Sequence, residues 1–313
     1  MAPQTVVLTL RVPNEARGQL LLEFLVSRFR YHSEAEWRAQ LRAARLRLDD
    51  RIADGAEELR AGMRLRYEKE HREPEVDDRY TVLHEDERLL VVDKPAHLPM
   101  HADGPFLRHT LIHLLRRDHG ETLQLVHRLD RETSGVVVVA KDKAAQAHVQ
   151  KQFGAGLAKE YVAVVAGVVT DGFVCREPIG RDPTSEVRLR RCARPDAVAP
   201  QPAETTVVPL RASRARTLVR CHPTTGRTHQ LRVHLEHRGH PVVGDKLYGR
   251  PDADYLEFVA RMKAGESVFD APVDEPHRQL LHAAALSLRH PADDAEVRFS
   301  APTPPDFERW LLC

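Results

Sequence analysis

The chain has 313 residues, of which 42% are hydrophobic and 30% charged, so it can bury the core of one large domain with or without a small one. No run approaches the roughly 18 apolar residues of a membrane span, the N-terminus lacks an export-signal pattern, and the four cysteines form no CxxC pair. These features exclude a membrane protein and a disulfide scaffold and predict a soluble, cytoplasmic protein. The net charge of +1 neither requires nor excludes nucleic acid, because binding depends on local basic patches.

The first 70 residues predict a small N-terminal module of helices and strands. A strand is expected at 5–11, helices at 18–29 and 34–46, a turn at 49–55 and a strand at 63–68. Arg38, Arg42 and Arg45 are spaced at i, i+4 and i+7 in the second helical pattern, which places them on one helix face. Such a face can contact RNA phosphates, although a solvated helix surface gives the same pattern.

A charged stretch with a proline follows, and residues 71–79 are interpreted as a linker to a larger domain at 80–313. Strands are expected there at 81–95, 123–129, 135–142, 159–169, 186–192, 204–212, 216–223 and 295–302, and helices at 107–118, 143–154, 228–239 and 253–265. This order indicates an α+β fold with a central mixed, mainly antiparallel sheet flanked by helices. No GxGxxG or GxxxxGK[ST] motif is present, so nucleotide cofactors of those classes are not expected.

Two segments contain candidate reactive groups. HRLDRETSG, at 127–135, places Asp130 between two arginines and ahead of a Thr-Ser-Gly turn. Taken alone, this aspartate can either cap the turn or serve a reaction. TTGRTHQLRVH, at 224–234, brings two arginines and two histidines to the start of a predicted helix. The free N–H groups and the dipole at such a start favour an anion such as phosphate.

Five motifs in order resemble those of the RluA-type pseudouridine synthases, over about 230 residues from Tyr80 onward. They are VVDKPAHLPMHA, HRLDRETSG, AKEYVAVVAG, GRTHQLRVH with GHPVVGDKLYG, and LLHAAALSL. The number and order of the motifs make the resemblance specific. The chain departs from the family at His97, where glycine is common, which leaves open the loop shape near the active-site entrance. It also lacks the usual lysine before the Ala-x-Thr of QPAETTVV.

The resemblance implies an RNA uridine isomerase that needs no cofactor. It implies Asp130 as nucleophile or base toward the sugar, Arg232 as the cation that keeps this carboxylate ionised, and Tyr161 as a stacking partner of the base that assists the C5 proton. Flipping is required because a stacked base hides its glycosidic bond, and Arg128 would fill the gap that it leaves. The implied base-flipping and RNA-binding residues are Arg128, His127, Thr133, Arg227, His229 and Leu281, of which the last packs near the base.

The N-terminal module is similar to S4-type RNA-binding domains, although RLDDRIADG replaces their Asn-Gly turn. RNA is therefore the expected partner, with 23S ribosomal RNA as the main candidate and transfer RNA as the alternative. A monomer without membrane contact is expected. Which uridine is modified does not follow from the residues, because such specificity depends on RNA shape.

The residues also permit other interpretations. His229, His234, His237 and His240 invite a metal site, but their spacing is not HExxH and no acid accompanies them, so no metal is expected. An RNA-binding assembly factor without catalysis would be free to lose Asp130, Tyr161 or Arg232, and all three are present. A hydrolase using Asp130 would need a second carboxylate, which no motif places.

Overall fold

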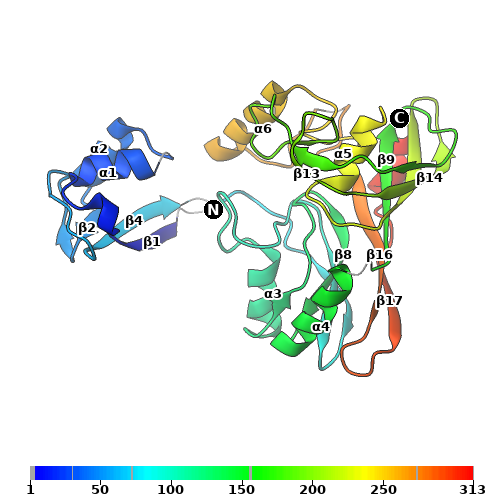
Figure 1. Ribbon diagram of the computed structural model, residues 1–313, viewed down its shortest axis with the longest axis horizontal. Helices are drawn as coiled ribbons and strands as arrows, with labels where there is room; N and C mark the ends of the chain where they lie inside the picture. The colour runs from blue at the N-terminus through cyan, green and yellow to red at the C-terminus, as the bar shows by residue number, and fades with distance from the viewer. Residues whose placement is uncertain (1–3, 30, 72, 155–156, 273, 313) are drawn as a thin grey trace. The chain divides into compact units, whose positions relative to one another are not determined.

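The computed structural model describes residues 4–29, 31–71, 73–154, 157–272 and 274–312. Two compact units divide the chain, Met1–Glu73 and Pro74–Cys313, which we call the N-terminal and C-terminal units (Figure 1). Each unit has its own sheet and its own buried core. Within the described ranges, no helix is long and apolar enough to cross a membrane.

The N-terminal unit is a four-stranded antiparallel sheet covered by helices. Its strands, in spatial order, are β1 (Gln4–Arg11), β4 (Arg64–His71), β2 (Leu46–Leu48) and β3 (Arg51–Ile52). The helical segments are η1 (Asn14–Ala16), α1 (Leu21–Arg28) and α2 (Glu34–Arg42). The largest side chains buried between helices and sheet are Leu21, Phe24, Trp37, Leu46 and Tyr67.

Helix α2 is shorter than the sequence predicted. A capping box fixes its start, because the Ser33 and Glu36 side chains each accept a hydrogen bond from the other residue's backbone N–H. The helix ends at Arg42, and Ala44 then adopts a left-handed φ of 55°, which turns the chain into β2. The predicted helix at 34–46 is therefore wrong over its last residues.

The predicted three-arginine face is consequently wrong as well. Arg38 and Arg42 share the exposed side of α2, but Arg45 lies beyond the helix end. The Arg45 guanidinium instead forms an ion pair with Glu70 of β4 at 2.6 Å.

A two-residue turn at Asp49 and Asp50 joins β2 to β3, and both residues have positive φ, 48° and 67°. Aspartate tolerates this conformation better than most residues, so the pair can form the turn without Asn-Gly. Strand β4 continues past its predicted end at 68 to His71, because its charged residues pair through the backbone with β1.

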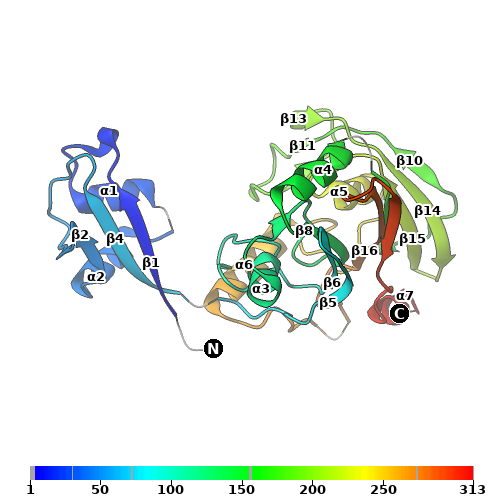
Figure 2. The ribbon, with the colours of Figure 1, turned by 90° about the horizontal axis from the view of Figure 1, so that it is seen from below.

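The C-terminal unit is built on a ten-stranded sheet. Its path runs β10 (Phe173–Cys175), β14 (Thr205–Ala212), β15 (Arg216–Pro223), β9 (Lys159–Ala166), β16 (Leu281–Arg289), β8 (Ser134–Ala140), β6 (Leu89–Lys94) and β5 (Thr81–Glu85), with β17 (Glu296–Ser300) on β16 and β7 (Gln124–Leu125) on β8. Only the β8–β16 pair is parallel among the described strands, so the predicted mixed, mainly antiparallel sheet is confirmed. Figure 2 shows β14 and β15 side by side, with β10 at the outer edge.

Helices cover both faces of this sheet. On one face lie α3 (Leu111–His119) and α5 (Gln230–His237), whose apolar side chains join two core clusters that share Tyr161. On the other lie α4 (Lys143–Gly154) and α7 (Asp306–Leu312). Helix α6 (Asp252–Ala264) has no fully buried residue, in contrast to these four.

Several predicted strands are shorter than expected. The strand predicted at 123–129 keeps only β7, because the chain leaves the sheet before Asp130. The strand predicted at 186–192 keeps only β12 (Arg191–Cys192), which forms a separate three-stranded sheet with β11 (Ile179–Arg181) and β13 (Val198–Gln201). These pieces of two to four residues are too short for apolar periodicity to reveal.

Candidate active site

Strand register brings the sequence motifs to one end of the large sheet. Tyr161 of β9 pairs with Ala283 of β16 on one side and with Cys221 of β15 on the other. The start of β16 pairs in parallel with the start of β8, at Ser134. Asp130 precedes β8, and the segment 224–232 follows β15, so both reach this end of the sheet.

A pocket of about 520 Å³ lies where these segments meet. All nine residues that the resemblance implied for the C-terminal domain line it: His127, Arg128, Asp130, Thr133, Tyr161, Arg227, His229, Arg232 and Leu281. The sequence interpretation thus named residues that do share one cavity.

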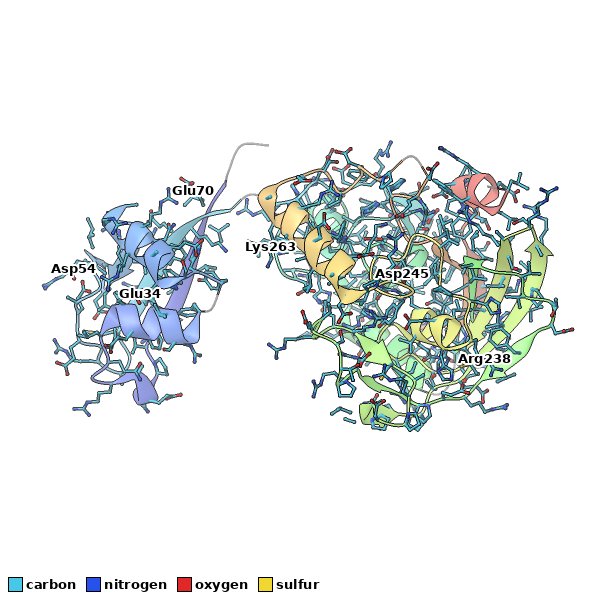
Figure 3. All side chains as sticks on the ribbon, turned by 90° about the horizontal axis from the view of Figure 1, so that it is seen from above. Glu34, Asp54, Glu70, Arg238, Asp245 and Lys263 are labelled. Carbon is cyan, nitrogen blue, oxygen red and sulfur yellow. The ribbon has the colours of Figure 1, made fainter. Side chains whose placement is uncertain are left out.

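A chain of three charged groups runs from the pocket into the interior. The Arg232 guanidinium donates from Nη1 to Asp130 Oδ2 at 2.7 Å. Its Nε and Nη2 donate to the two carboxylate oxygens of Asp245 at 2.6 and 2.8 Å. Asp245 is fully buried inside the C-terminal unit (Figure 3), and the backbone N–H groups of Leu247 and Tyr248 donate to its Oδ1. Arg232 is therefore held in place by Asp245 and presented to Asp130.

The surroundings of Asp130 favour its ionised form. Burial acts to raise the pKa of this carboxyl group, but the positive charges of His229 and Arg232 outweigh that effect and lower the pKa to about 2. Burial also lowers the pKa of His229 to about 4, so at neutral pH the cations that act on Asp130 are Arg232, which bonds to it, and Arg128. The Asp130 side chain keeps 32% of its surface exposed, which leaves it accessible from the pocket.

Tyr161 and Leu281 form an apolar wall next to Asp130. The Tyr161 ring packs on both core clusters of its sheet face, and Leu281 is buried at the start of the neighbouring strand. Burial, together with the negative charge of Asp130, raises the pKa of the Tyr161 hydroxyl, so this group is neutral at physiological pH. The wall can accept a flat aromatic ring, and the phenol can donate or relay a proton.

Two arginines, Arg128 and Arg227, lie exposed at the rim of the pocket. Arg128 donates from Nη2 to Thr228 Oγ1 at 3.0 Å, so it links the two loops that face each other across the pocket. Arg227 donates from Nε to the Pro202 carbonyl at 2.9 Å. The backbone N–H of Arg227 donates to Gln230 Oε1 at 3.0 Å, which ties the segment before α5 to the first residue of that helix.

Three other predicted residues, His127, Thr133 and His229, contact neighbouring groups of the protein. His127 Nε2 accepts a hydrogen bond from the Val138 backbone N–H, and its ring stacks on Phe153. Thr133 is buried and its hydroxyl accepts from Gln279 at 2.6 Å. His229, at the left-handed N-cap of α5, has its Nδ1 2.8 Å from the Tyr248 hydroxyl. These contacts fix the shape of the pocket walls.

Sequence reasoning missed four residues of this arrangement: Lys159, Gln230, Asp245 and Tyr248. Lys159 lines the pocket, and its ammonium donates to the Thr225 carbonyl at 2.7 Å. Gln230 bonds to the hydroxyls of Thr225 and Thr205 and so ties the 224–229 loop to β14. Asp245 and Tyr248 stand within the quoted GDKLYG, but nothing in that spacing indicates that they surround Arg232.

The four histidines considered as a metal site are separated by their partners. His229 contacts Tyr248, His234 lies between Thr205 and the Glu177 carbonyl, and His240 bonds to the Ala166 carbonyl. Within the described ranges, they form no group whose ligating atoms converge.

Turnover should therefore be independent of metal. We expect activity to survive exhaustive EDTA treatment, because the described residues that line the pocket include no converging set of three metal-ligating side chains. Rates measured on the same preparation before and after chelation test this expectation. Loss of activity that added zinc restores would contradict it.

His97 replaces the glycine that is common in the family, and it keeps a left-handed backbone with φ 62°. Its buried ring stacks on His277, with Nε2 2.8 Å from His277 Nδ1, and packs edge-on against Phe269. His97 lines a second cavity of about 390 Å³ and does not line the pocket of Asp130.

Known proteins resemble this chain in sequence over most of its length. The sequence pattern of a family described as RNA pseudouridylate synthase matches residues 88–237. A Pseudomonas aeruginosa protein named ribosomal large subunit pseudouridine synthase D is 34% identical over 311 residues, covering 96% of this chain and 93% of that protein. The Escherichia coli protein of the same name is 32% identical over 317 residues and covers 97% and 93%.

A solved structure shares the fold. Human RNA pseudouridylate synthase domain containing 1 is 29% identical, with a TM-score of 0.57, and it covers 74% of this chain and 87% of its own. Identity above 30% across nearly the whole length, together with the matched family pattern, shows the relationship. The chain therefore belongs to the RluA-type family of RNA pseudouridine synthases, which are isomerases acting on uridines of RNA.

Proposed function

We propose that this enzyme isomerises uridines of large-subunit (23S) ribosomal RNA, using Asp130 on a uridine flipped into the pocket. The observation that carries the proposal is the chain Asp130–Arg232–Asp245, which presents an ionised carboxylate to a cavity of about 520 Å³. The printed names of its relatives, ribosomal large subunit pseudouridine synthase D, favour ribosomal over transfer RNA as substrate.

The reaction breaks the N1–C1′ bond, turns the uracil and joins C5 to C1′. An ionised Asp130 can serve as nucleophile at the sugar or as base toward it, and Arg232 keeps the carboxylate in the form that both routes require. The C5 proton leaves and N1 gains one, so the product is an isomer of the substrate. The balance needs neither a redox partner nor ATP.

The pocket walls have complementary roles in this proposal. The uracil stacks on Tyr161 beside Leu281, and the neutral phenol assists the C5 proton. Arg128 leaves Thr228 when RNA binds and fills the gap in the RNA stack. Arg227 contacts phosphate at the rim, while His127, Thr133 and His229 hold the walls.

Tritium release from transcripts containing 5-tritiated uridine tests the substrate. We expect release from large-subunit ribosomal RNA and none from a transfer RNA pool at equal concentration. Release from transfer RNA alone would contradict the proposed substrate, and release from neither would contradict the proposed activity.

We further propose that residues 1–70 form an S4-like RNA-binding domain, joined to the catalytic domain at 80–313 by a linker at 71–79. Its contribution would come from exposed cations such as Arg38 and Arg42 of α2. The Arg38–Glu34 ion pair does not argue against this role, because exposed pairs are weak and easily exchanged for phosphate. Arg45, paired with Glu70, contributes less.

Replacing Arg38 and Arg42 with alanine should weaken RNA binding and flatten its salt dependence. Each lost phosphate contact should reduce the log–log slope by about 0.7 to 0.9, because fewer counterions are released. Turnover at saturating RNA should change little, since Asp130, Tyr161 and Arg232 lie in the C-terminal unit. Filter binding at several salt concentrations, with single-turnover rates, measures both effects. The matched double lysine variant keeps the charge and should keep the slope; an unchanged slope in the alanine variant would remove these arginines from the RNA interface.

A further inference from the structure

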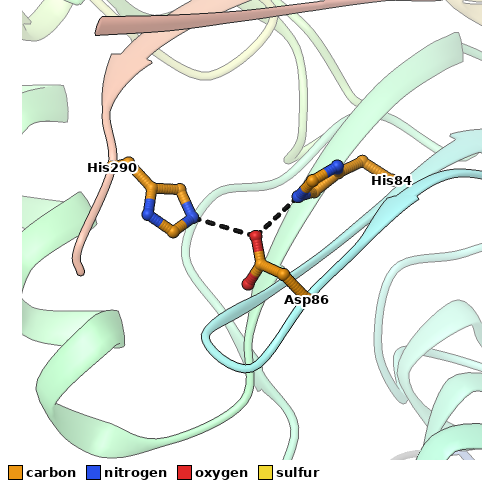
Figure 4. Close-up of side chains that lie close together, drawn as sticks. All are labelled: His84, Asp86 and His290. Carbon is orange, nitrogen blue, oxygen red and sulfur yellow. Dashed lines mark hydrogen bonds and ion pairs between the residues drawn. The ribbon is translucent and has the colours of Figure 1, made fainter. Parts of the chain in front are cut away.

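Two histidines and an aspartate converge on the large sheet, outside the pocket (Figure 4). His84 belongs to β5, Asp86 follows that strand, and His290 follows β16. The Nε2 atoms of His84 and His290 lie 2.5 and 3.0 Å from the same oxygen, Asp86 Oδ2. All three atoms lie within 4.8 Å of one another, so their lone pairs can be directed toward one point.

The carboxylate is oriented before anything binds. Asp86 Oδ1 accepts hydrogen bonds from the backbone N–H groups of Arg88 and Leu89 at 2.7 and 2.9 Å. Oδ2 is thereby turned toward the two imidazoles. Such anchoring of the non-ligating oxygen is typical of carboxylates at metal sites.

The two rings differ in access to water. The His84 side chain is 40% exposed and rests near the Phe299 ring, whereas His290 is 13% exposed. The far nitrogen of His290, Nδ1, accepts from the Ala292 N–H at 3.3 Å and lies 3.8 Å from an Asp293 carboxylate oxygen. Solvent can therefore reach the group on the His84 side.

We propose that His84, Asp86 and His290 bind one divalent transition-metal ion of the zinc class, with water in the remaining position. Two imidazoles and a carboxylate are a ligand set for such ions. Ligand atoms bound at about 2.0 to 2.2 Å from a tetrahedral ion lie about 3.3 Å from one another. His84 Nε2 lies 2.5 Å from Asp86 Oδ2, so this exposed ring needs only a small movement to bind the ion. Each imidazole binds the ion as the neutral ring through Nε2, so a proton held on Nε2 moves by way of solvent to Nδ1 of the same ring, and His290 Nδ1 then gives up the bond from the Ala292 N–H.

The site is structural rather than catalytic. Strand β16 spans nine residues between Leu281, at the pocket, and His290, a distance of about 30 Å for an extended chain. Asp86 and His290 are 204 residues apart in the sequence, so a bound ion would cross-link the turn after β5 to the turn after β16. It should stabilise the C-terminal unit and leave turnover unchanged.

A neighbouring pair supplies a matched control. His119 Nδ1 lies 3.1 Å from Glu85 Oε2, which gives another histidine–carboxylate contact close by in sequence to Asp86. His119 is not part of any converging group of three among the described residues. Replacing it removes one imidazole without touching the proposed ligands.

The test is a zinc titration of the full chain, stripped of metal beforehand and assayed against a chromophoric competitor. We expect one tight equivalent, at least a tenfold loss of affinity in His84→Ala and in Asp86→Asn, and no change in His119→Ala. Cobalt should give the visible spectrum of a low-coordinate nitrogen–oxygen site only where His84 and Asp86 are intact. At zinc a hundredfold above its Kd, the unfolding midpoint of the wild type should rise by about 5 °C, and that of His84→Ala should not.

Because His84 is exposed, its replacement should leave the protein folded, and circular dichroism without metal verifies this. Absence of a saturable equivalent in the wild type would overturn the proposal. Equal affinity in the wild type and both ligand variants would overturn it too, since the zinc would then be bound elsewhere.

Discussion

Asp130→Asn should reduce the single-turnover rate by at least about 10⁴-fold, which is the scale of losing an essential nucleophile or base. Asparagine has nearly the same shape but no negative charge to act at the sugar. Binding of RNA should remain within a few-fold of the wild type, because the side chain sits inside the pocket and not at its basic rim. Tritium release and filter binding on the same RNA separate the two effects.

The variant should also fold, so a loss of turnover can be assigned to the missing carboxylate and not to unfolding. Arg232 keeps both bonds to Asp245, so removing the Asp130 charge leaves no unpaired buried cation. Asp196→Asn is a suitable control, because that carboxylate is exposed and forms an ion pair with Arg194, away from the pocket. It should retain full activity. Substantial turnover by Asp130→Asn would exclude this carboxylate from the mechanism.

Asp245→Asn should lower kcat by about 10²-fold with little change in the RNA concentration at half-saturation. Arg232 loses its charged, two-oxygen partner and with it the geometry that directs Nη1 to Asp130, and displacements near 1 Å cost about that factor. With the guanidinium loosened, burial raises the pKa of Asp130 from about 2, so the acid limb of the rate profile moves toward neutral pH.

The pH profile distinguishes this positioning role from simple destabilisation. Breaking a buried pair costs about 3 to 5 kcal/mol, so thermal unfolding should be followed and rates taken well below the midpoint. Asp252→Asn is the control, since it removes a partner of Arg190 in an ion pair that does not include Arg232. A fully folded Asp245→Asn enzyme with the wild-type rate and profile would show that Asp245 does not position Arg232.

The sequence predicted an element correctly where the residues of that element alone determine its structure. The helix predicted at 143–154 matches α4, because Asp142 caps it and its pattern is uninterrupted. The helix predicted at 34–46 fails at Ala44, whose left-handed conformation has no marker in the residue type. The strand predicted at 123–129 fails because the same apolar residues pack in a loop that delivers Asp130.

The sequence predicted which residues belong to the site, but not the contacts that hold them in place. Motif resemblance selected Asp130 and Arg232, which lie 102 residues apart and meet only because β8, β16, β9 and β15 are neighbours. Asp245 could not be recognised, since its role depends on a turn that buries the carboxylate under Arg232. The His84–Asp86–His290 group was missed for the same reason, since Asp86 and His290 lie 204 residues apart and meet only in the folded chain.

The central claim is that Asp130 of this chain makes pseudouridine in ribosomal RNA, and a pseudouridine map tests it most directly. Ribosomal RNA would be mapped from cells lacking the gene, and from the same cells given either the wild-type gene or Asp130→Asn at equal protein level. We expect large-subunit sites that disappear with the gene, return with the wild type and stay absent with the variant. Sites restored equally by the variant, or no site lost with the gene, would contradict it.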